Sequence, residues 1–252
     1  KLIHDSMKQC CQDTNESVLQ YGDIPGYKDF RVSLSDYFKR NYNIITNPNN
    51  LFLTNGISQG LFMMCSLFTK PNQYIIVEEP TYFLAINIFK EFGLNIISIP
   101  MESDGLNLDI LENKLDSLNT NERILMYTVP IFHNPTGITL SIEKRRKLVK
   151  IVEKHNLFVM ADEVYHFLSF NDSESESDIK PLRFYSPNSD IISMGTFAKI
   201  LAPSLRLGWI DANDSIIKKI SDCAYLDSNG GLNPFIASIV HNLLDNNLLN
   251  TH

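Results

Sequence analysis

The sequence predicts an α/β fold with three layers, in which helices cover both faces of a mostly parallel sheet. Short apolar runs rich in β-branched residues alternate with longer stretches whose apolar residues recur at helical spacing. The short runs are apolar at consecutive positions, which is typical of strands covered on both faces. Strands that alternate with helices form parallel sheets with helical crossovers. A chain of 252 residues, 44% of them hydrophobic, can bury the core that such a fold needs.

The individual elements follow from these periodicities in chain order. Residues 1–15 are polar and fit part of a helix, and residues 21–26 have turn chemistry. The predicted strands span residues 51–54, 74–77, 124–129 and 158–161. The predicted helices span residues 27–41, 58–68, 81–92 and 141–155, the last with Ser141 as its N-cap and Asn156 as its stop.

Composition and charge argue against several classes of partner. The formal net charge of −7 argues against nucleic acid or an anionic membrane bound through bulk electrostatics. No apolar run reaches the roughly 18 residues of a membrane span. The four cysteines show neither metal-ligand spacing nor a disulfide framework, so no metal is predicted and a reducing compartment is expected. We expect the cytoplasm, with the mitochondrion as the alternative.

Charged runs and one histidine are interpreted as structural. Residues 171–178, NDSESESD, favour an exposed flexible loop over a phosphorylation site. Residues 144–150, KRRKLVK, are interpreted as the solvated face of an amphipathic helix rather than an anion site. His133 is given no role, because nothing in the sequence pairs it with a nucleophile or a metal.

Several side chains follow the predicted strands at the edge where open α/β sheets bind ligands. Gly56 permits close approach of a ligand, and the helix that opens at Ile57 or Ser58 presents unpaired N–H groups that suit a phosphate; the alternative is a simple helix cap. Asp162 ends an apolar strand, where a carboxylate needs a cation such as a protonated pyridine nitrogen.

The remaining candidates at this edge carry polar or aromatic groups. Asn134 lies in an Asn-Pro-Thr-Gly turn, and its amide can donate to a phenolate oxygen, as can the hydroxyl of Tyr165. Tyr82 can stack its ring on an aromatic cofactor. Taken singly, the turn has no function and each tyrosine fits the core or the rim of a site.

Residues 191–210 contain the most informative lysine. Lys199 follows a β-branched run, and a lysine held beside groups that lower its pKa forms a Schiff base with a carbonyl. Thr196 offers a hydroxyl and Arg206 a planar fork of donors to an anion. Hydroxyl, lysine and arginine together suit an aldehyde cofactor that carries a phosphate. A solvated surface lysine is the alternative.

Together these residues resemble the class I/II aminotransferases, the fold-type-I enzymes that use pyridoxal 5′-phosphate (PLP), over nearly the whole chain. The lysine motif of the family appears as TFAK at residues 196–199 and PSLRLGW at residues 203–209. The family's Asn-Pro-Thr-Gly is residues 134–137, and its Asp-x-x-Tyr is residues 162–165. YTVPIFHNPTG and EEPTYF are similar to the branch with 2-aminoadipate, kynurenine and aromatic aminotransferases.

The resemblance implies a role for each matching residue. Lys199 would form the aldimine, Asp162 would hold the pyridine nitrogen, and Asn134 and Tyr165 would donate to the ring hydroxyl. The phosphate would be held by Thr196, Arg206 and the N–H groups of Ile57 and Ser58 beside Gly56, with Tyr82 covering the ring and Tyr21 reaching the phosphate of a second subunit. The family commonly has serines where this chain has Thr196, Ala198 and Ile57.

The resemblance also implies a domain plan and a reaction. Residues 1–20 would be a truncated N-terminal segment and residues 21–252 the PLP-binding large domain, without the C-terminal small domain that binds the substrate carboxylate. The expected activity is ping-pong transfer of an amino group between an amino acid and a 2-oxo acid, in a homodimer. The alternatives are a PLP lyase or decarboxylase, and the PLP-binding effector domain of a transcription regulator.

Overall fold

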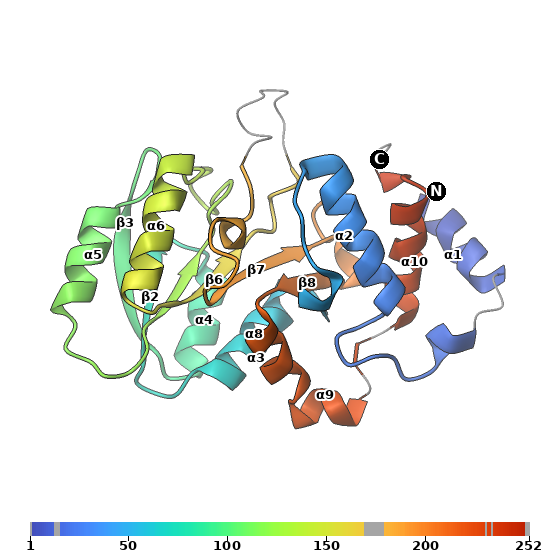
Figure 1. Ribbon diagram of the computed structural model, residues 1–252, viewed down its shortest axis with the longest axis horizontal. Helices are drawn as coiled ribbons and strands as arrows, with labels where there is room; N and C mark the ends of the chain where they lie inside the picture. The colour runs from blue at the N-terminus through green and yellow to red at the C-terminus, as the bar shows by residue number, and fades with distance from the viewer. Residues whose placement is uncertain (1, 13–15, 169–178, 230, 233, 250–252) are drawn as a thin grey trace. The chain divides into compact units, whose positions relative to one another are not determined.

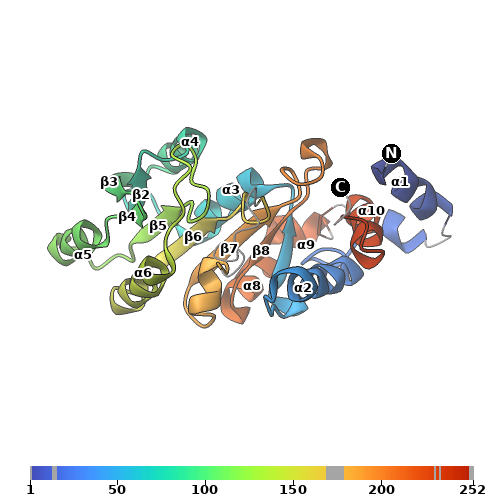
Figure 2. The same ribbon diagram turned by 90° about the horizontal axis from the view of Figure 1, so that it is seen from above.

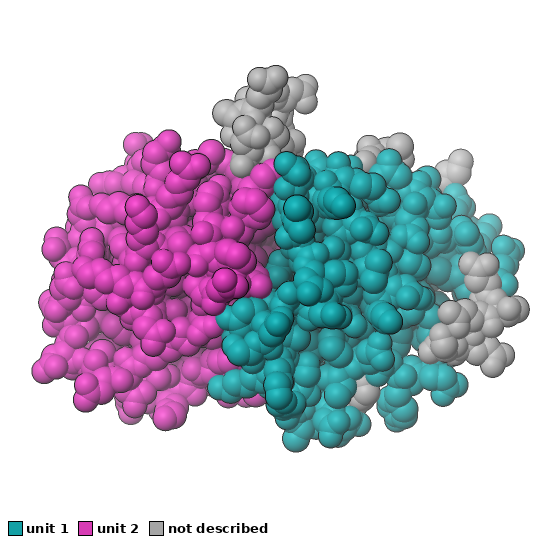
Figure 3. Space-filling model, viewed as in Figure 1, with its two compact units in different colours: residues 1–56, 196–252 teal, residues 57–195 magenta. Residues whose placement is uncertain are grey.

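The computed structural model describes residues 2–12, 16–168, 179–229, 231–232 and 234–249 (Figure 1). The chain divides into two compact units, which Figure 3 colours separately. Unit 1 comprises residues 1–56 and 196–252, and unit 2 comprises residues 57–195. The domain boundaries predicted from the resemblance stay a prediction, and the acidic run at residues 171–178 lies outside the described residues.

Unit 2 is built on a sheet with the strand order β7-β6-β5-β2-β3-β4. Its strands are β2 (Tyr74–Glu79), β3 (Asn95–Glu102), β4 (Gly105–Leu106), β5 (Leu125–Thr128), β6 (Phe158–Asp162) and β7 (Ile191–Thr196), whose last residue belongs to unit 1. All neighbouring pairs are parallel except β3 and β4. The carboxyl ends of the parallel strands therefore meet at one edge of the sheet.

Helices cover both faces of the unit 2 sheet (Figure 2). One face carries α3 (Ile57–Phe68) and α4 (Phe83–Glu91), and the other carries α5 (Leu108–Ser117) and α6 (Ile142–Lys154). Every residue of β5 and β6 is buried, because helices lie on both sides. Apolar side chains of the strands and of α5 and α6 form one core, to which each fully buried aliphatic residue contributes about 1.5–3 kcal/mol. The predicted three-layer α/β fold is confirmed.

The predicted bounds of α6 are confirmed by its caps. The Ser141 side chain accepts a hydrogen bond from the backbone N–H of Lys144 at 3.3 Å, which satisfies one of the unpaired donors of the first turn. Asn156 follows the helix with φ +50°, a left-handed conformation that ends helical hydrogen bonding. The strand-turn-helix pattern therefore predicted this element to within one residue at each end.

The interpretation of residues 144–150 as a solvated face is wrong at Arg145. Arg146, Lys147 and Lys150 are exposed, but the Arg145 side chain is 0% exposed. Its guanidinium donates to the carbonyl oxygens of Leu140, Pro130 and Lys180 at 2.9, 2.5 and 3.1 Å. A helix-face pattern cannot reveal this burial, because the acceptors come from segments outside the helix.

Unit 1 contains an antiparallel pair, β1 (Leu51–Thr54) and β8 (Gly208–Asp211), with Leu51 opposite Asp211. The predicted strand at residues 51–54 is thus confirmed in its bounds. Helices α1 (Leu2–Gln12) and α2 (Lys28–Tyr42) match the predicted first two helices, and α8 (Asp214–Ser221), α9 (Ala224–Asn229) and α10 (Pro234–Asp245) follow β8. The ring of Phe197 packs against the rings of Phe30 and Trp209, with distances between ring centroids of 5.9 and 5.0 Å. This packing anchors the turn that carries Lys199.

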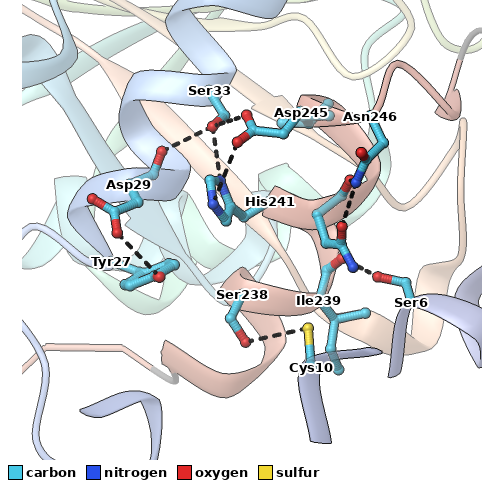
Figure 4. Close-up of polar contacts among 12 residues, drawn as sticks. Ser6, Cys10, Tyr27, Asp29, Ser33, Ser238, Ile239, His241, Asp245 and Asn246 are labelled. Atoms are coloured by element: carbon cyan, nitrogen blue, oxygen red, sulfur yellow. Dashed lines mark hydrogen bonds and ion pairs between the residues drawn. The ribbon is translucent and has the colours of Figure 1, made fainter. Parts of the chain in front are cut away.

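Polar contacts join α1 and α2 to α10 in unit 1 (Figure 4). Ser33 contacts His241 Nδ1 at 2.8 Å and donates to Asp245 Oδ1 at 2.5 Å, and Ser6 donates to the Ile239 carbonyl at 2.7 Å. A pocket of about 420 Å³ lies beside these contacts and is lined by Cys10, Val18, Tyr27, Asp29, Ser238, His241, Asn242, Asp245 and Asn246. None of the predicted site residues lines it.

Two findings concern the described residues alone. Within them, no helix combines the length and the hydropathy needed to cross a membrane. In the same part of the chain, no group of three or more histidine, cysteine and acidic side chains is arranged to hold a metal ion.

Candidate active site

The candidate residues of unit 2 lie at the carboxyl edge of its sheet. Asp162 is the last residue of β6, Asn134 follows β5, and Tyr82 directly precedes α4 after β2. The Asp162 side chain is buried, with the residue 4% exposed. A buried carboxylate is stabilised by hydrogen-bond donors or a cation, so Asp162 is suited to contact a ligand that carries one.

Asn134 and Tyr165 come together at this edge. The Asn134 amide donates to the Tyr165 hydroxyl at 3.4 Å, although the residues lie on different loops. The contact is long for a hydrogen bond, and it brings two donor groups to one place. An oxygen atom placed between them can accept from both.

Tyr82 lies close to the same groups. Burial raises the pKa of Tyr82, and electrostatic interaction with Asp162 and Tyr165 raises it further. The phenol therefore stays protonated at neutral pH, with a partly buried ring. Such a ring can cover an aromatic ligand.

Tyr127 is a member of this group that sequence reasoning missed. Its hydroxyl donates to Asp162 Oδ2 at 2.8 Å, and the residue is 0% exposed. Burial raises the pKa of Tyr127 well above its usual value, and the Asp162 carboxylate raises it further, so the phenol remains a donor. In the sequence it looks like any apolar strand residue, and only the pairing of Tyr127 with Met160 across β5 and β6 brings it near Asp162.

Replacing Tyr127 with phenylalanine is expected to lower the free energy of unfolding by about 1–3 kcal/mol, because the Asp162 carboxylate loses a donor while it stays buried. Urea unfolding measures the change. Tyr74→Phe on β2 is the matched control, since it removes the hydroxyl of a partly buried tyrosine that packs on the same core. Equal stability of the two variants would show that the Tyr127 bond contributes nothing.

The unit 1 candidates surround a tight turn before α3. Gly56 has φ +81°, and a Cβ atom at this position would lie 2.5 Å from Arg206 Nη2. Arg206 donates through Nη2 to the Asn55 carbonyl at 3.1 Å and through Nη1 to the Pro203 carbonyl at 3.2 Å. Glycine is therefore required both by the backbone conformation and by the guanidinium beside it. Ile57 and Ser58 follow as the first residues of α3.

Lys199 lies in the turn that follows β7, and its side chain is exposed. Thr196, at the end of β7, donates its hydroxyl hydrogen to the Leu207 carbonyl at 2.9 Å and accepts from the Ala198 N–H at 3.1 Å. The Thr196 side chain thus holds the turn, and it must release Leu207 to donate to an anion. Tyr21 is 87% exposed, so its ring is accessible from outside the chain.

Comparisons with known proteins bear on these residues. A family profile described as aminotransferase class I and II matches residues 2–232. Aromatic-amino-acid aminotransferase 1 of Thermococcus litoralis is 31% identical over 222 residues, which cover 87% of this chain and 52% of that protein.

Solved structures of aminotransferases are also similar to this chain. A multiple substrate aminotransferase from Thermococcus profundus matches with a TM-score of 0.89 at 29% identity, covering 100% of this chain and 62% of that chain. A kynurenine aminotransferase from Pyrococcus horikoshii, solved in complex with PMP, matches with a TM-score of 0.86 at 27% identity, covering 100% of this chain and 61% of that chain. The chain spans about half the length of the curated relatives it matches.

Proposed function

Because the chain belongs to the class I and II aminotransferases, we propose that it forms the cofactor-binding part of an enzyme that uses PLP to move an amino group from an amino acid to a 2-oxo acid. The observation that carries the proposal is the group at the unit 2 sheet edge. A buried carboxylate, Asp162, lies there with Tyr127, and the amide of Asn134 and the hydroxyl of Tyr165 come together.

The chemistry of these side chains fits a pyridine ring with a hydroxyl substituent. Asp162 would accept a hydrogen bond from the protonated ring nitrogen, a cation that a buried carboxylate stabilises. Asn134 and Tyr165 would donate to the ring oxygen, and Tyr82 would cover the ring.

Lys199, Thr196, Arg206 and the residues at the start of α3 fit an aldehyde that carries a phosphate. Arg206 lies against Gly56, where a Cβ atom would occupy the space beside the guanidinium. The N–H groups of Ile57 and Ser58 open α3, a helix of 12 residues, and an anion at this end meets unpaired donors and the positive end of the helix dipole. Thr196 would add its hydroxyl, and Tyr21 of a second subunit would complete the site in a homodimer.

Lys199 is the residue that we propose to carry the cofactor and the proton. When bound, PLP withdraws electrons from the substrate Cα and holds the amino group between two half-reactions. The Lys199 amine would hold the cofactor through its aldehyde and, when free, would take the proton from the substrate Cα. Asp162 would keep the proton on the ring nitrogen. The names of the relatives support aromatic amino acids as the first donors to test.

The test is to add PLP to the protein that contains this chain, reduce it with borohydride and map the labelled peptide. We expect the label on Lys199. A screen of amino acids should then convert bound PLP to its amine form and release the matching 2-oxo acid. Release of carbon dioxide instead would assign a decarboxylase, and binding without conversion would assign a sensor. A label on another lysine would reject the site.

A further inference from the structure

Glu78 is a buried carboxylate on β2 for which the sequence predicted no role. It is 3% exposed. Its Oε1 accepts a hydrogen bond from the Thr128 hydroxyl at 2.5 Å, and its Oε2 accepts one from the Val129 N–H at 2.9 Å. Both donors lie at the end of β5, directly before the loop that carries Asn134. Glu78 therefore ties β2 to the start of this loop.

The same carboxylate faces the imidazole of His133. His133 Nε2 lies 3.1 Å from Glu78 Oε2, and the histidine side chain is 0% exposed. On the other side of the ring, Nδ1 lies 2.9 Å from the Thr136 hydroxyl. A polar oxygen thus lies within 3.1 Å of each ring nitrogen, and the buried imidazole is confined between Glu78 and Thr136.

The backbone around His133 is equally constrained. Its N–H donates to the Ile138 carbonyl at 2.8 Å, and its carbonyl accepts from the Gly137 N–H at 2.6 Å. Asn134 is the next residue, and its amide reaches Tyr165. The position of the Asn134 side chain is thus set by a residue whose ring and backbone are both held.

We propose that Glu78 and His133 form a positioning pair that fixes the Asn134 amide where it donates to the ring hydroxyl of the cofactor. The inference rests on the proposed function. Neither Glu78 nor His133 touches the cofactor; both act through Asn134. The physical reason is that a donor contributes fully only when its geometry exists before the ligand binds, and buried polar partners remove the alternative conformations.

A double-mutant cycle tests whether the pair acts through Asn134. The readouts are the dissociation constant of PLP and the absorption maximum of the bound cofactor, neither of which requires turnover. His133→Leu is expected to weaken PLP binding about tenfold and to shift the absorption maximum. In an Asn134→Ala background the same substitution is expected to change neither quantity, because the residue it positions is gone. Additive effects in the two backgrounds would overturn the proposal.

Two milder variants and a control accompany the cycle. His133→Gln keeps a donor toward Glu78 and is expected to bind PLP within about threefold of the unmodified protein. Thr136→Val removes the partner of His133 Nδ1. If His133→Leu does not fold, Thr136→Val replaces it and is compared in the same two backgrounds, with Asn134 and with Asn134→Ala. His155→Leu removes a histidine near Asp116 at the opposite, amino edge of the sheet. The absorption maximum of PLP bound to this variant should be unchanged. A shift of the same size with His155→Leu would show a general structural effect and reject the pair.

Borohydride labelling separates this inference from the proposed function. Labelling of Lys199 in the unmodified protein, together with effects of His133→Leu that disappear in the Asn134→Ala background, supports both. Labelling of Lys199 with unchanged binding and absorption in His133→Leu rejects the positioning pair alone. Absence of labelling at Lys199 in the unmodified protein rejects both.

Discussion

Replacing Lys199 with alanine is expected to lower kcat by about 10⁴-fold, because the proposed mechanism uses this amine both to carry the cofactor and to take the proton from the substrate Cα. Cofactor binding should weaken but persist, since Asp162, Asn134 and the donors around Gly56 do not depend on the lysine. Steady-state kinetics give kcat, and titration of cofactor fluorescence gives the affinity. The two readouts separate a lost reaction from a lost cofactor.

The control for this substitution is Lys218→Ala. Lys218 belongs to α8 in the same unit and pairs with Asp222 four residues later, an exposed contact that contributes little to stability. Its removal is expected to leave kcat unchanged. Substantial turnover by well-purified Lys199→Ala protein would contradict the assignment of the catalytic amine, since no second lysine belongs to the predicted motif.

The elements predicted well from the sequence are those whose signals are local. The strand at residues 158–161 is continuously apolar because helices cover both faces of the sheet, and the observed strand extends it by one residue. The helix after Ser141 has a capping side chain and a left-handed residue at its end. In contrast, β3 was not predicted as a strand; its residues are mostly exposed or half-buried, so it lacks the continuous apolar run of the central strands.

The features that sequence reasoning missed depend on long-range contacts. Glu78 and His133 are 55 residues apart in the sequence, and only the adjacency of β2 and β5 brings them together. Tyr127 meets Asp162 for the same reason across β5 and β6. Neither periodicity nor motif spacing contains this information. The motif residues themselves could be named from the sequence, because their residue types occur together in a recognisable order; their roles stay a prediction.

The buried guanidinium of Arg145 shows how such a long-range contact affects stability. Arg145 donates to the carbonyls of Pro130 and Leu140, the two ends of the loop that carries Asn134, and to the carbonyl of Lys180. Its Nη1 also lies 4.0 Å from Glu163 Oε1. Burial lowers the pKa of Arg145, and Glu163 opposes that change; a guanidinium nevertheless stays protonated in proteins. One cation therefore compensates several buried acceptors.

Replacing Arg145 with methionine is accordingly expected to lower the free energy of unfolding by about 3–5 kcal/mol, because it leaves three carbonyls and the Glu163 carboxylate without this donor. Arg145→Lys should recover little of the loss, since a point charge cannot reach three acceptors with the planar fork of a guanidinium. Arg146→Met is the matched control. Arg146 is the exposed neighbour of Arg145, and its replacement should change the free energy of unfolding by no more than about 0.5 kcal/mol. Urea unfolding curves with equal slopes give the comparison. If Arg145→Met unfolds at the same urea concentration as Arg146→Met, the three carbonyls do not need the guanidinium, and the loop that presents Asn134 is held by other contacts.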